Sequence, residues 1–374
     1  MNQDLRHLLA LLSIPGIDAK LIRQLIDHYG SARAVIEADR STLLAQPRLA
    51  HLFSRIGSNT QLLDRADREL QFMADHHIQA LVYGSEDYPR RLAMCPDAPA
   101  VLFQLGTSVL HRPHIVSIVG TRNCTQYGRD LTQRFIAELQ AQIPDVVIVS
   151  GLAFGIDVSA HQGALACNVH TVGVVAHGLD RIYPSQHREV ARQMIAQGGS
   201  VVTEYLTGTQ PERRNFLARN RIIAGLADAV LVAESKDRGG SLVTASIALD
   251  YGRDVYAFPG RVGDNRSEGC NRLIRLNRAG LITSAEDFVE AMNWNTTHGQ
   301  QKSIQHSIPF EEDDLRPNAR LILDALRDRG DMLMSQLADA TCLDNTTLYE
   351  ELLDLEMDGK IRNTPGGLYQ LRQP

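Results

Sequence analysis

The middle of this 374-residue sequence predicts an α/β fold with a doubly wound, mostly parallel sheet. The prediction rests on short apolar runs rich in β-branched residues, on amphipathic segments between most of them, and on polar loops after them. The apolar runs are Ile115–Val119, Val146–Val149, Thr171–Val175, Val201–Val202, Ala229–Ala233 and Val255–Phe258. The amphipathic segments are Tyr127–Gln142, Asp157–Ala166, His187–Gln197 and Leu242–Tyr251.

The apolar runs also indicate where a ligand binds. They are nearly continuous, as is typical of parallel strands that are covered by helices on both faces. Ligands of such sheets bind beyond the carboxyl ends of the strands, where the loops collect. These loops include GTRNCTQYG, SGLAFGID, TEYLTGTQPERRNFLARNR and ESKDRGGS, in which Gly, Ser, Thr, Asn and Arg recur. We therefore expect the functional site in the loops of a domain that spans residues 78–292.

The N-terminal residues 1–77 have a helical pattern with little strand signal. Leu5, Leu8, Leu9 and Leu12 recur at helical spacing, and the segment Ala19–Tyr29 repeats this after the break IPGI. This order is typical of a helix-hairpin-helix, whose turn amides can bind a DNA phosphate. The turn carries no cation, however, so a small helical bundle is the favoured interpretation.

The C-terminal part consists of a polar, acidic linker over residues 293–314 and a compact module over residues 315–374. Helices are predicted at Asn318–Arg329, Ser335–Ala340 and Asn345–Met357, followed by two strands around a Pro-Gly-Gly turn, which is the order of a winged helix. The would-be recognition helix, DNTTLYEELLDLEMD, carries six carboxylates and no Lys or Arg. It is therefore expected to contact protein rather than the phosphates of a duplex.

Composition places the chain among globular proteins of the cytoplasm. Hydrophobic residues make up 44%, charged residues 22%, and the net charge is -6. There is no apolar run of transmembrane length and no signal-peptide pattern, so no membrane association is expected. The five cysteines form no CxxC pair, which argues against a disulfide framework and a thiolate metal site.

The common catalytic templates are missing. The sequence lacks GxxxxGK[ST] and GxGxxG, which weakens the ATPase and dehydrogenase interpretations, and it lacks GxSxG and HExxH. We therefore predict no metal and no cofactor. His161 is a candidate general base, but a structural histidine is favoured because no nucleophile or acid can be paired with it.

The residues that remain point to anion binding without turnover. The loop Gln210–Arg221 combines arginines with Phe216 and Asn220, and Arg122 follows Gly120 directly at a strand end. Guanidinium groups bind successive phosphates, and an exposed aromatic ring stacks on an unpaired base. The arginines alone leave open that they face solvent or pair with carboxylates.

Glycine-bearing helix starts support the same interpretation. Gly151 and Gly155 precede one helix, next to Ser150, and Gly240 and Ser241 open another. Small residues at helix N-termini let backbone amides approach a phosphate closely. Together with the arginine-rich strip, these loops predict a groove lined for phosphate groups.

Long motifs in the same region resemble one family. SIVGTR, SGLAFGIDVSAH, GLDRIYP, ARNRIIAGLADAVLVAES, GGSLVTASIALDYGRDVYAFPG and GCNRLI, in this order, are similar to the DNA-processing protein A family, DprA, also called Smf. The resemblance spans about Leu81 to Asp287. It implies an extended Rossmann-like domain that binds single-stranded DNA as a homodimer and loads the RecA recombinase during natural transformation. The flanking modules resemble the helix-hairpin-helix or SAM-like and winged-helix-like modules of longer members.

The resemblance also implies site residues, because the GTR arginine of the family matches Arg122 and its FPxRNR segment matches Phe216–Arg221. Leu217 replaces the proline of that segment, and the short LIxxGA segment is extended to LIRLNRAGLI. The predicted DNA-binding residues are Gly120, Thr121, Arg122, Ser150, Gly151, Gly155, Arg213, Arg214, Phe216, Arg219, Asn220, Arg221, Gly240 and Ser241.

Two other classes of function stay open. The architecture is also similar to phosphoribohydrolases related to the lysine-decarboxylase-like family, which act on nucleoside monophosphates. Such an enzyme needs a carboxylate beside its glycine loop, for which Glu204 or Glu234 is available, but the PGGxGT loop is absent. The third class is a scaffolding protein whose acidic C-terminal module recruits partners.

Overall fold

The computed structural model describes residues 2–38, 47–53, 58–107, 109–294, 316–364 and 367–371. The chain divides into two compact units, residues 1–296 and 297–374, which are described separately. Most of the predicted acidic linker lies outside the described residues. In the part of the chain that is described, no helix is both long enough and apolar enough to cross a membrane.

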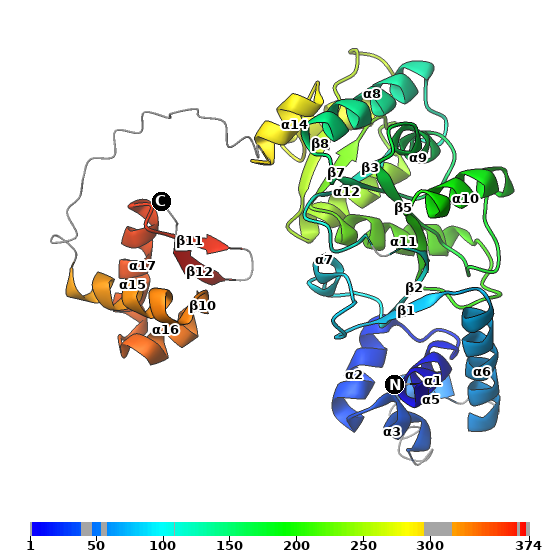
Figure 1. Ribbon diagram of the computed structural model, residues 1–374, viewed down its shortest axis with the longest axis horizontal. Coiled ribbons are helices and arrows are strands. Elements are labelled where there is room, and N and C mark those ends of the chain that lie inside the picture. The colour runs from blue at the N-terminus through cyan, green and yellow to red at the C-terminus, as the bar shows by residue number, and fades with distance from the viewer. Residues whose placement is uncertain are drawn as a thin grey trace. The chain divides into compact units, whose positions relative to one another are not determined.

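The first unit is built on a nine-stranded sheet in the order β1-β2-β6-β5-β4-β3-β7-β8-β9 (Figure 1). The strands in this spatial order are Gln79–Val82, Val101–Gly106, Ser200–Thr203, His170–Val174, Val147–Ser150, Ile115–Val119, Ala229–Val232, Asp254–Ala257 and Gly280–Leu281. In this spatial order, all neighbouring strands from β6 to β9 pair parallel. The strand β2 pairs antiparallel with both β1 and β6. The predicted doubly wound, mostly parallel sheet is confirmed.

Alternate residues of the central strands face opposite sides of the sheet, and each side is covered by helices. On β4, Val147 and Val149 belong to one core and Ile148 to the other. The first core includes residues of α7 (Arg90–Ala93), α11 (Arg213–Leu226), α12 (Gly240–Asp250) and α13 (Glu268–Arg275). The opposite face is covered by α8 (Gln126–Gln142), α9 (Ile156–Ala166), α10 (Arg188–Ala196) and α14 (Ala285–Ala291).

The chain reverses its direction of travel across the sheet between β3 and β7. From β3 it moves outward through β4, β5 and β6, and from β7 it moves outward on the other side through β8 and β9. The loops after β3 and β7 therefore diverge and leave a crevice at the carboxyl ends of these two strands, where open α/β sheets bind ligands.

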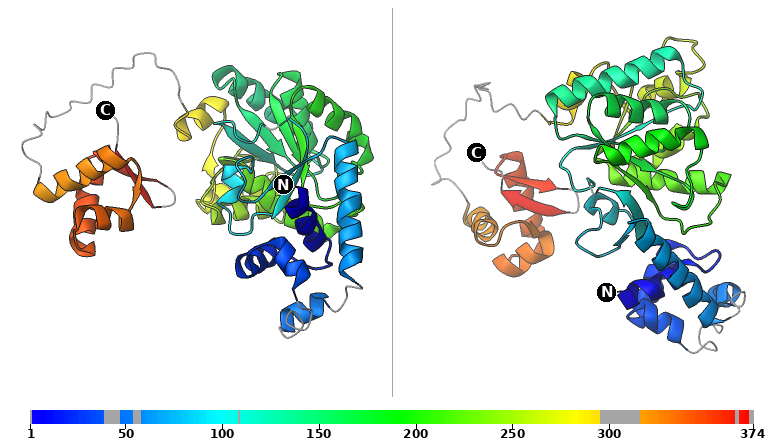
Figure 2. Two further views of the ribbon diagram at one scale, coloured as in Figure 1. Left: turned by 60° about the horizontal axis from the view of Figure 1, so that its bottom comes forward. Right: turned by 45° about the vertical axis from the view of Figure 1, so that its right-hand side comes forward.

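The N-terminal helices share a core with one end of the sheet. They are α1 (Asn2–Leu12), α2 (Ala19–Tyr29), α3 (Ala32–Glu37), α5 (Pro47–Phe53) and α6 (Asn59–Asp75), and they lie beside β1 and β2 in each view (Figures 1 and 2). Leu9 and Ile22 pack in one apolar cluster with Val101 and Phe103 of β2. The predicted boundary at residues 77 and 78 thus does not separate two cores.

The second unit consists of α15 (Pro317–Arg329), β10 (Met332–Leu333), α16 (Met334–Thr341), α17 (Asn345–Met357), β11 (Ile361–Thr364) and β12 (Leu368–Leu371). Its strands form an antiparallel sheet in the order β10-β12-β11. Leu323, Leu337, Leu352 and Ile361 are buried together and join the helices to the sheet. This is the element order predicted for a winged-helix module, with the short β10 added.

Candidate nucleic-acid interface

A cleft of about 690 Å³ lies at the carboxyl ends of β3 and β7. The loop after β3 contributes Gly120, Thr121 and Arg122, and the start of α12 contributes Gly240 and Ser241. The Thr121 amide donates to the Glu234 carbonyl at 2.8 Å, which ties the two loops together at the bottom of the crevice. The topology therefore brings together residues that are far apart in the sequence.

Gly155 allows the loop between β4 and α9 to pack directly on the loop after β3. Its φ is +80°, and a Cβ atom there would lie 2.2 Å from the Thr121 carbonyl oxygen. The neighbouring Ile156 amide donates to that same carbonyl at 3.2 Å. Gly155 thus sets the position of Thr121 and Arg122 through a close backbone approach, and it does not itself line the cleft.

Four exposed cations line the cleft without ion pairs to any residue in the described ranges. They are Arg122, Arg213, Lys236 and Arg238. A surface cation that has no carboxylate partner is free to bind phosphate. Lys236 and Arg238 were not predicted. Both lie in the loop ESKDRGGS after β7. Their position at a strand end, beside two glycines, could have indicated from the sequence that they belong to the site.

Phe216 forms an aromatic wall of the same cleft. The Arg122 guanidinium carbon lies 5.0 Å from the centre of the Phe216 ring, a cation–π geometry. Asn220 follows one helical turn later on α11 and also lines the cleft. An aromatic ring, an amide and unpaired cations together offer contacts to a base, a base edge and the phosphates.

Arg219 also lines the cleft, with its guanidinium carbon 6.0 Å from the centre of the Phe216 ring, but its side chain is buried rather than exposed. Only 3% of Arg219 is exposed, and its Nη1 donates to the carbonyls of Gly151, at 2.7 Å, and Val174. Burial lowers its pKa to about 10. Burial also raises the pKa of the neighbouring Asp157, and the charge of Arg219 opposes that shift. Arg219 therefore holds the ends of β4 and β5 together.

Gly151 and Ser150 serve this internal packing as well. A Cβ atom at Gly151 would lie 2.5 Å from Nη1 of Arg219, so the missing side chain makes room for the guanidinium. The Ser150 hydroxyl donates to the Ile118 carbonyl at 2.6 Å and is fully buried. Neither residue lines the cleft.

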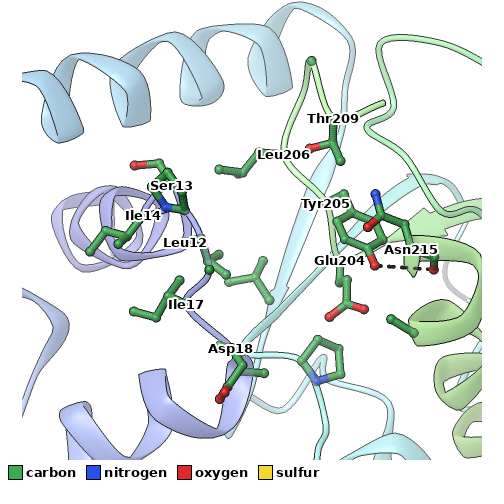
Figure 3. Close-up of a pocket in the computed structure, with 18 of the residues that line it drawn as sticks. Leu12, Ser13, Ile14, Ile17, Asp18, Glu204, Tyr205, Leu206, Thr209 and Asn215 are labelled. Atoms are coloured by element: carbon green, nitrogen blue, oxygen red, sulfur yellow. Dashed lines mark hydrogen bonds between the residues drawn. The ribbon is translucent and has the colours of Figure 1, made fainter. Parts of the chain in front are cut away.

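Arg214 and Arg221 lie on the other side of α11, where they line a separate hollow of about 960 Å³. Figure 3 shows Glu204, Tyr205 and Asn215 on one wall of this hollow and the α1–α2 turn, including Ile14 and Ile17, on the other. Arg221 pairs with Glu204 and donates to the Asp97 carbonyl at 2.7 Å. Arg214 pairs with Glu212 at 2.8 Å.

The carboxylates considered for an enzyme do not line the cleft. Glu204 faces the hollow behind α11, and burial raises its pKa although Arg221 is its partner. Glu234 is buried and accepts the Thr125 amide at 2.8 Å, and it fills the space beside Gly128. Both carboxylates are thus used in contacts within the protein.

His161 is fully buried on α9. Its Nδ1 lies 2.7 Å from the Thr171 hydroxyl, which itself donates to the Ile148 carbonyl, so Nδ1–H is the donor in that pair. Burial lowers the pKa of His161 to about 3. These contacts fit the structural role favoured from the sequence. Within the described ranges, no group of three His, Cys, Asp or Glu side chains is placed to hold a metal ion.

Comparison with known proteins assigns the sheet domain to a family. The family model for DNA recombination-mediator protein A matches residues 79–293, more than half of the chain. The chain belongs to this DNA recombination-mediator protein A family. The predicted resemblance to DprA and Smf is confirmed, because curated relatives with these names match over most of the chain.

Two relatives of the family illustrate the extent of the similarity. Protein Smf of Synechocystis sp. is 32% identical over 99% of this chain and 100% of its own. The DNA processing protein DprA of Streptococcus pneumoniae is 42% identical over 54% of this chain and 70% of its own.

Solved structures of the family share the fold. The crystal structure of DprA from Streptococcus pneumoniae covers 76% of this chain and 97% of its own, with a TM-score of 0.61 and 33% identity. A structure of DprA from Helicobacter pylori, described as giving insight into a single-stranded DNA binding mode, covers 58% of this chain and 96% of its own, with a TM-score of 0.52 and 31% identity.

Proposed function

We propose that this protein binds single-stranded DNA, with little sequence preference, in the cleft at the carboxyl ends of β3 and β7. The observation that carries the proposal is a cleft that is lined by Phe216 and by Arg122, Arg213, Lys236 and Arg238, four cations without ion pairs to the described part of the chain. Membership of the family supports it, as does the single-stranded DNA binding mode described for the Helicobacter pylori relative. Gly120, Thr121, Asn220, Gly240 and Ser241 complete the proposed surface.

The shape of the cleft favours an unpaired strand over a duplex. Phe216 is partly buried in the wall of a concave site, so a base must leave its stack to reach the ring. No side-chain cap is formed at Gly239, which precedes α12, and the Leu242 amide donates to the Gly239 carbonyl, so the amides of Gly240 and Ser241 are the ones that a phosphate could use. Backbone amides and guanidinium groups recognise the sugar-phosphate chain without reading its sequence.

We further propose that the protein acts in the cytoplasm as a recombination mediator that holds incoming strands and loads RecA onto them. The family description supports a role in recombination. A homodimer would fit the exposed leucines near one edge of the sheet, since Leu281 in the edge strand β9 is 52% exposed and Leu276 at the end of α13 is 50% exposed. An exposed apolar pair at a sheet edge is a suitable place for self-association.

We propose a binding role without turnover. An enzyme acting on nucleoside monophosphates would need an acid or base at the cleft, and Glu204 and Glu234 are instead paired with Arg221 and the Thr125 amide. The carboxylate that does line the cleft, Asp157, is buried beside the charge of Arg219. Release of free base from a nucleoside monophosphate, lost in Glu204→Gln or Glu234→Gln, would favour the enzyme instead.

The test is a titration of labelled single-stranded and duplex oligonucleotides with the wild-type protein and Arg122→Ala. We expect tighter binding of the single strand and roughly tenfold weaker binding by Arg122→Ala, since a charge-assisted contact to phosphate is worth about 1.5 kcal/mol. Arg214→Ala is the matched control, because Arg214 lies outside the cleft and pairs with Glu212. Equal binding of both DNA forms, or normal binding by Arg122→Ala, would contradict the proposal.

A further inference from the structure

A second hollow, of about 430 Å³, adjoins the cleft at the ring of Phe216. Phe216 lines the cleft, Tyr183 lines the second hollow, and the centroids of their rings are 5.9 Å apart. The loop between β4 and α9 also spans both, since Ala153 lines the cleft and the next residue, Phe154, lines the second hollow. A chain that leaves the cleft past Phe216 therefore meets the second hollow next.

Two large rings of the second hollow are exposed to solvent. Tyr183 is 48% exposed and Phe154 is 44% exposed. Phe154 makes an edge contact with His187, with ring centroids 4.9 Å apart, and this contact supports its ring from one side. Phe154 is therefore held in place without being buried. Supported but exposed aromatic faces are the platforms on which unpaired bases stack.

The charge around this hollow suits a base better than a phosphate. Its cation, Arg181, donates to the Asp180 carboxylate at 2.7 Å and to the Gln210 side-chain oxygen at 2.7 Å. Asp180 also accepts the Gly208 amide at 3.0 Å, so the pair is fixed in place. The adjoining cleft, in contrast, holds four cations without ion pairs to described residues.

We propose that the hollow lined by Tyr183 and Phe154 is a second subsite for the DNA strand, in which a neighbouring nucleotide stacks its base while its phosphate stays with the cations of the cleft. This inference rests on the proposed function. The subsite would lengthen the bound segment by stacking alone, and stacking tolerates every base because each has an aromatic face.

The experiment is a double-mutant cycle between the protein and the DNA. The probes are a short labelled oligothymidylate and two analogues of it. One analogue lacks the bases of its 5′ half, and the other lacks the bases of its 3′ half. The protein variants are Tyr183→Ala and Tyr183→Phe, with Tyr127→Ala as the matched control, because Tyr127 is 64% exposed on α8 and lines neither hollow.

We expect Tyr183→Ala to weaken binding of the complete oligothymidylate about tenfold, which is the scale of stacking one base on one ring. Tyr183→Phe and Tyr127→Ala should bind as the wild type does. One of the two abasic analogues should bind the wild type and Tyr183→Ala equally, because the base that stacks on Tyr183 is missing from it.

Two results would overturn the subsite while leaving the proposed function intact: normal binding of the oligothymidylate by Tyr183→Ala, or the same loss with both abasic analogues. A wild-type protein that does not bind the oligothymidylate would overturn both proposals. A thermal unfolding curve for Tyr183→Ala that matches the wild type would show that a loss of binding does not come from misfolding.

Discussion

Helix α11 separates two hollows that are both lined by arginine and that differ in how this charge is balanced. On the front of the helix, Arg213 joins Arg122 in a cleft where neither has an ion pair with a described residue. On its back, Arg221 is paired with Glu204 and Arg214 with Glu212. Arginine content alone therefore does not distinguish the two hollows, and our proposal assigns DNA binding to the one whose arginines have no carboxylate partner among the described residues.

The largest expected effect is on stability and comes from breaking the ion pair between Arg221 and Glu204. Replacing Arg221 by Met leaves Glu204 buried without a cation, which should lower the free energy of unfolding by about 3 kcal/mol. Urea unfolding followed by circular dichroism measures this change. The double variant Glu204→Leu with Arg221→Met should recover most of the loss, since an apolar pair replaces a buried ion pair at little net cost.

Two results would contradict the stabilising role of the Arg221–Glu204 ion pair. One is a single variant Arg221→Met that unfolds at the wild-type urea concentration. The other is a double variant that remains as unstable as the single one, which would assign the loss to packing rather than to the unpaired carboxylate.

A second effect concerns the helix α9 below the cleft. The pKa of His161 is lowered to about 3 in the folded protein, so the unfolded chain binds a proton more readily below its ordinary pKa of about 6.5. Stability from this residue is therefore complete above about pH 6.5 and is lost as pH falls toward 3. Between pH 7 and pH 5 the loss should be about 2 kcal/mol.

The pH effect is isolated by comparison with His161→Gln, which keeps a group able to donate to the Thr171 hydroxyl and cannot titrate. Thermal unfolding across this pH range should show a shallower pH dependence in the variant. Parallel curves for the two proteins would contradict the buried, neutral state of His161.

The smallest expected effect is on DNA binding and comes from removing one exposed cation of the cleft. Arg238→Ala should weaken binding of single-stranded DNA about threefold at low salt, since an exposed cation at the rim of the cleft contributes about 0.5–1 kcal/mol. The matched control is Arg272→Ala, because Arg272 is also partly exposed but pairs with Asp237 at 2.9 Å. Fluorescence anisotropy measures both. An equal loss in the two variants would mean that overall charge, and not the cleft, determines binding.

The parallel core of the sheet could be predicted because its strands are continuous apolar runs. The edge pair escaped prediction for a physical reason: β1 is partly exposed, and the apolar run of β2 is interrupted by the buried Gln104. The edge strand β1 therefore lacks the signal that burial on both faces gives to β3 or β7, whereas β2 is buried on both faces and is hidden only by its polar residue.

The site could be predicted only in part because the sequence predicts a loop for the arginine-rich strip Gln210–Arg221. The structure places Arg213–Leu226 in one helix, and helical periodicity then distributes neighbouring arginines to different sides. Arg213 is exposed at the cleft, Arg219 lines the cleft but is buried, and Arg221 lines the opposite hollow. Arg122, in contrast, was placed correctly at a strand end, because the topology of a parallel sheet fixes where such ends collect.

The central claim is that the cations of the cleft, such as Arg122 and Arg213, hold phosphates. The paired arginines of the other hollow, Arg214 and Arg221, do not. The claim's most direct test is the slope of log Kd against log salt concentration for single-stranded DNA in the wild type, Arg122→Ala, Arg213→Ala and Arg214→Ala. Each of the first two substitutions should reduce the slope by about 0.7, the value for one phosphate contact on a single strand, and Arg214→Ala should leave it unchanged. Equal slopes in all four proteins, or a reduction in Arg214→Ala as large as in Arg122→Ala, would contradict the account.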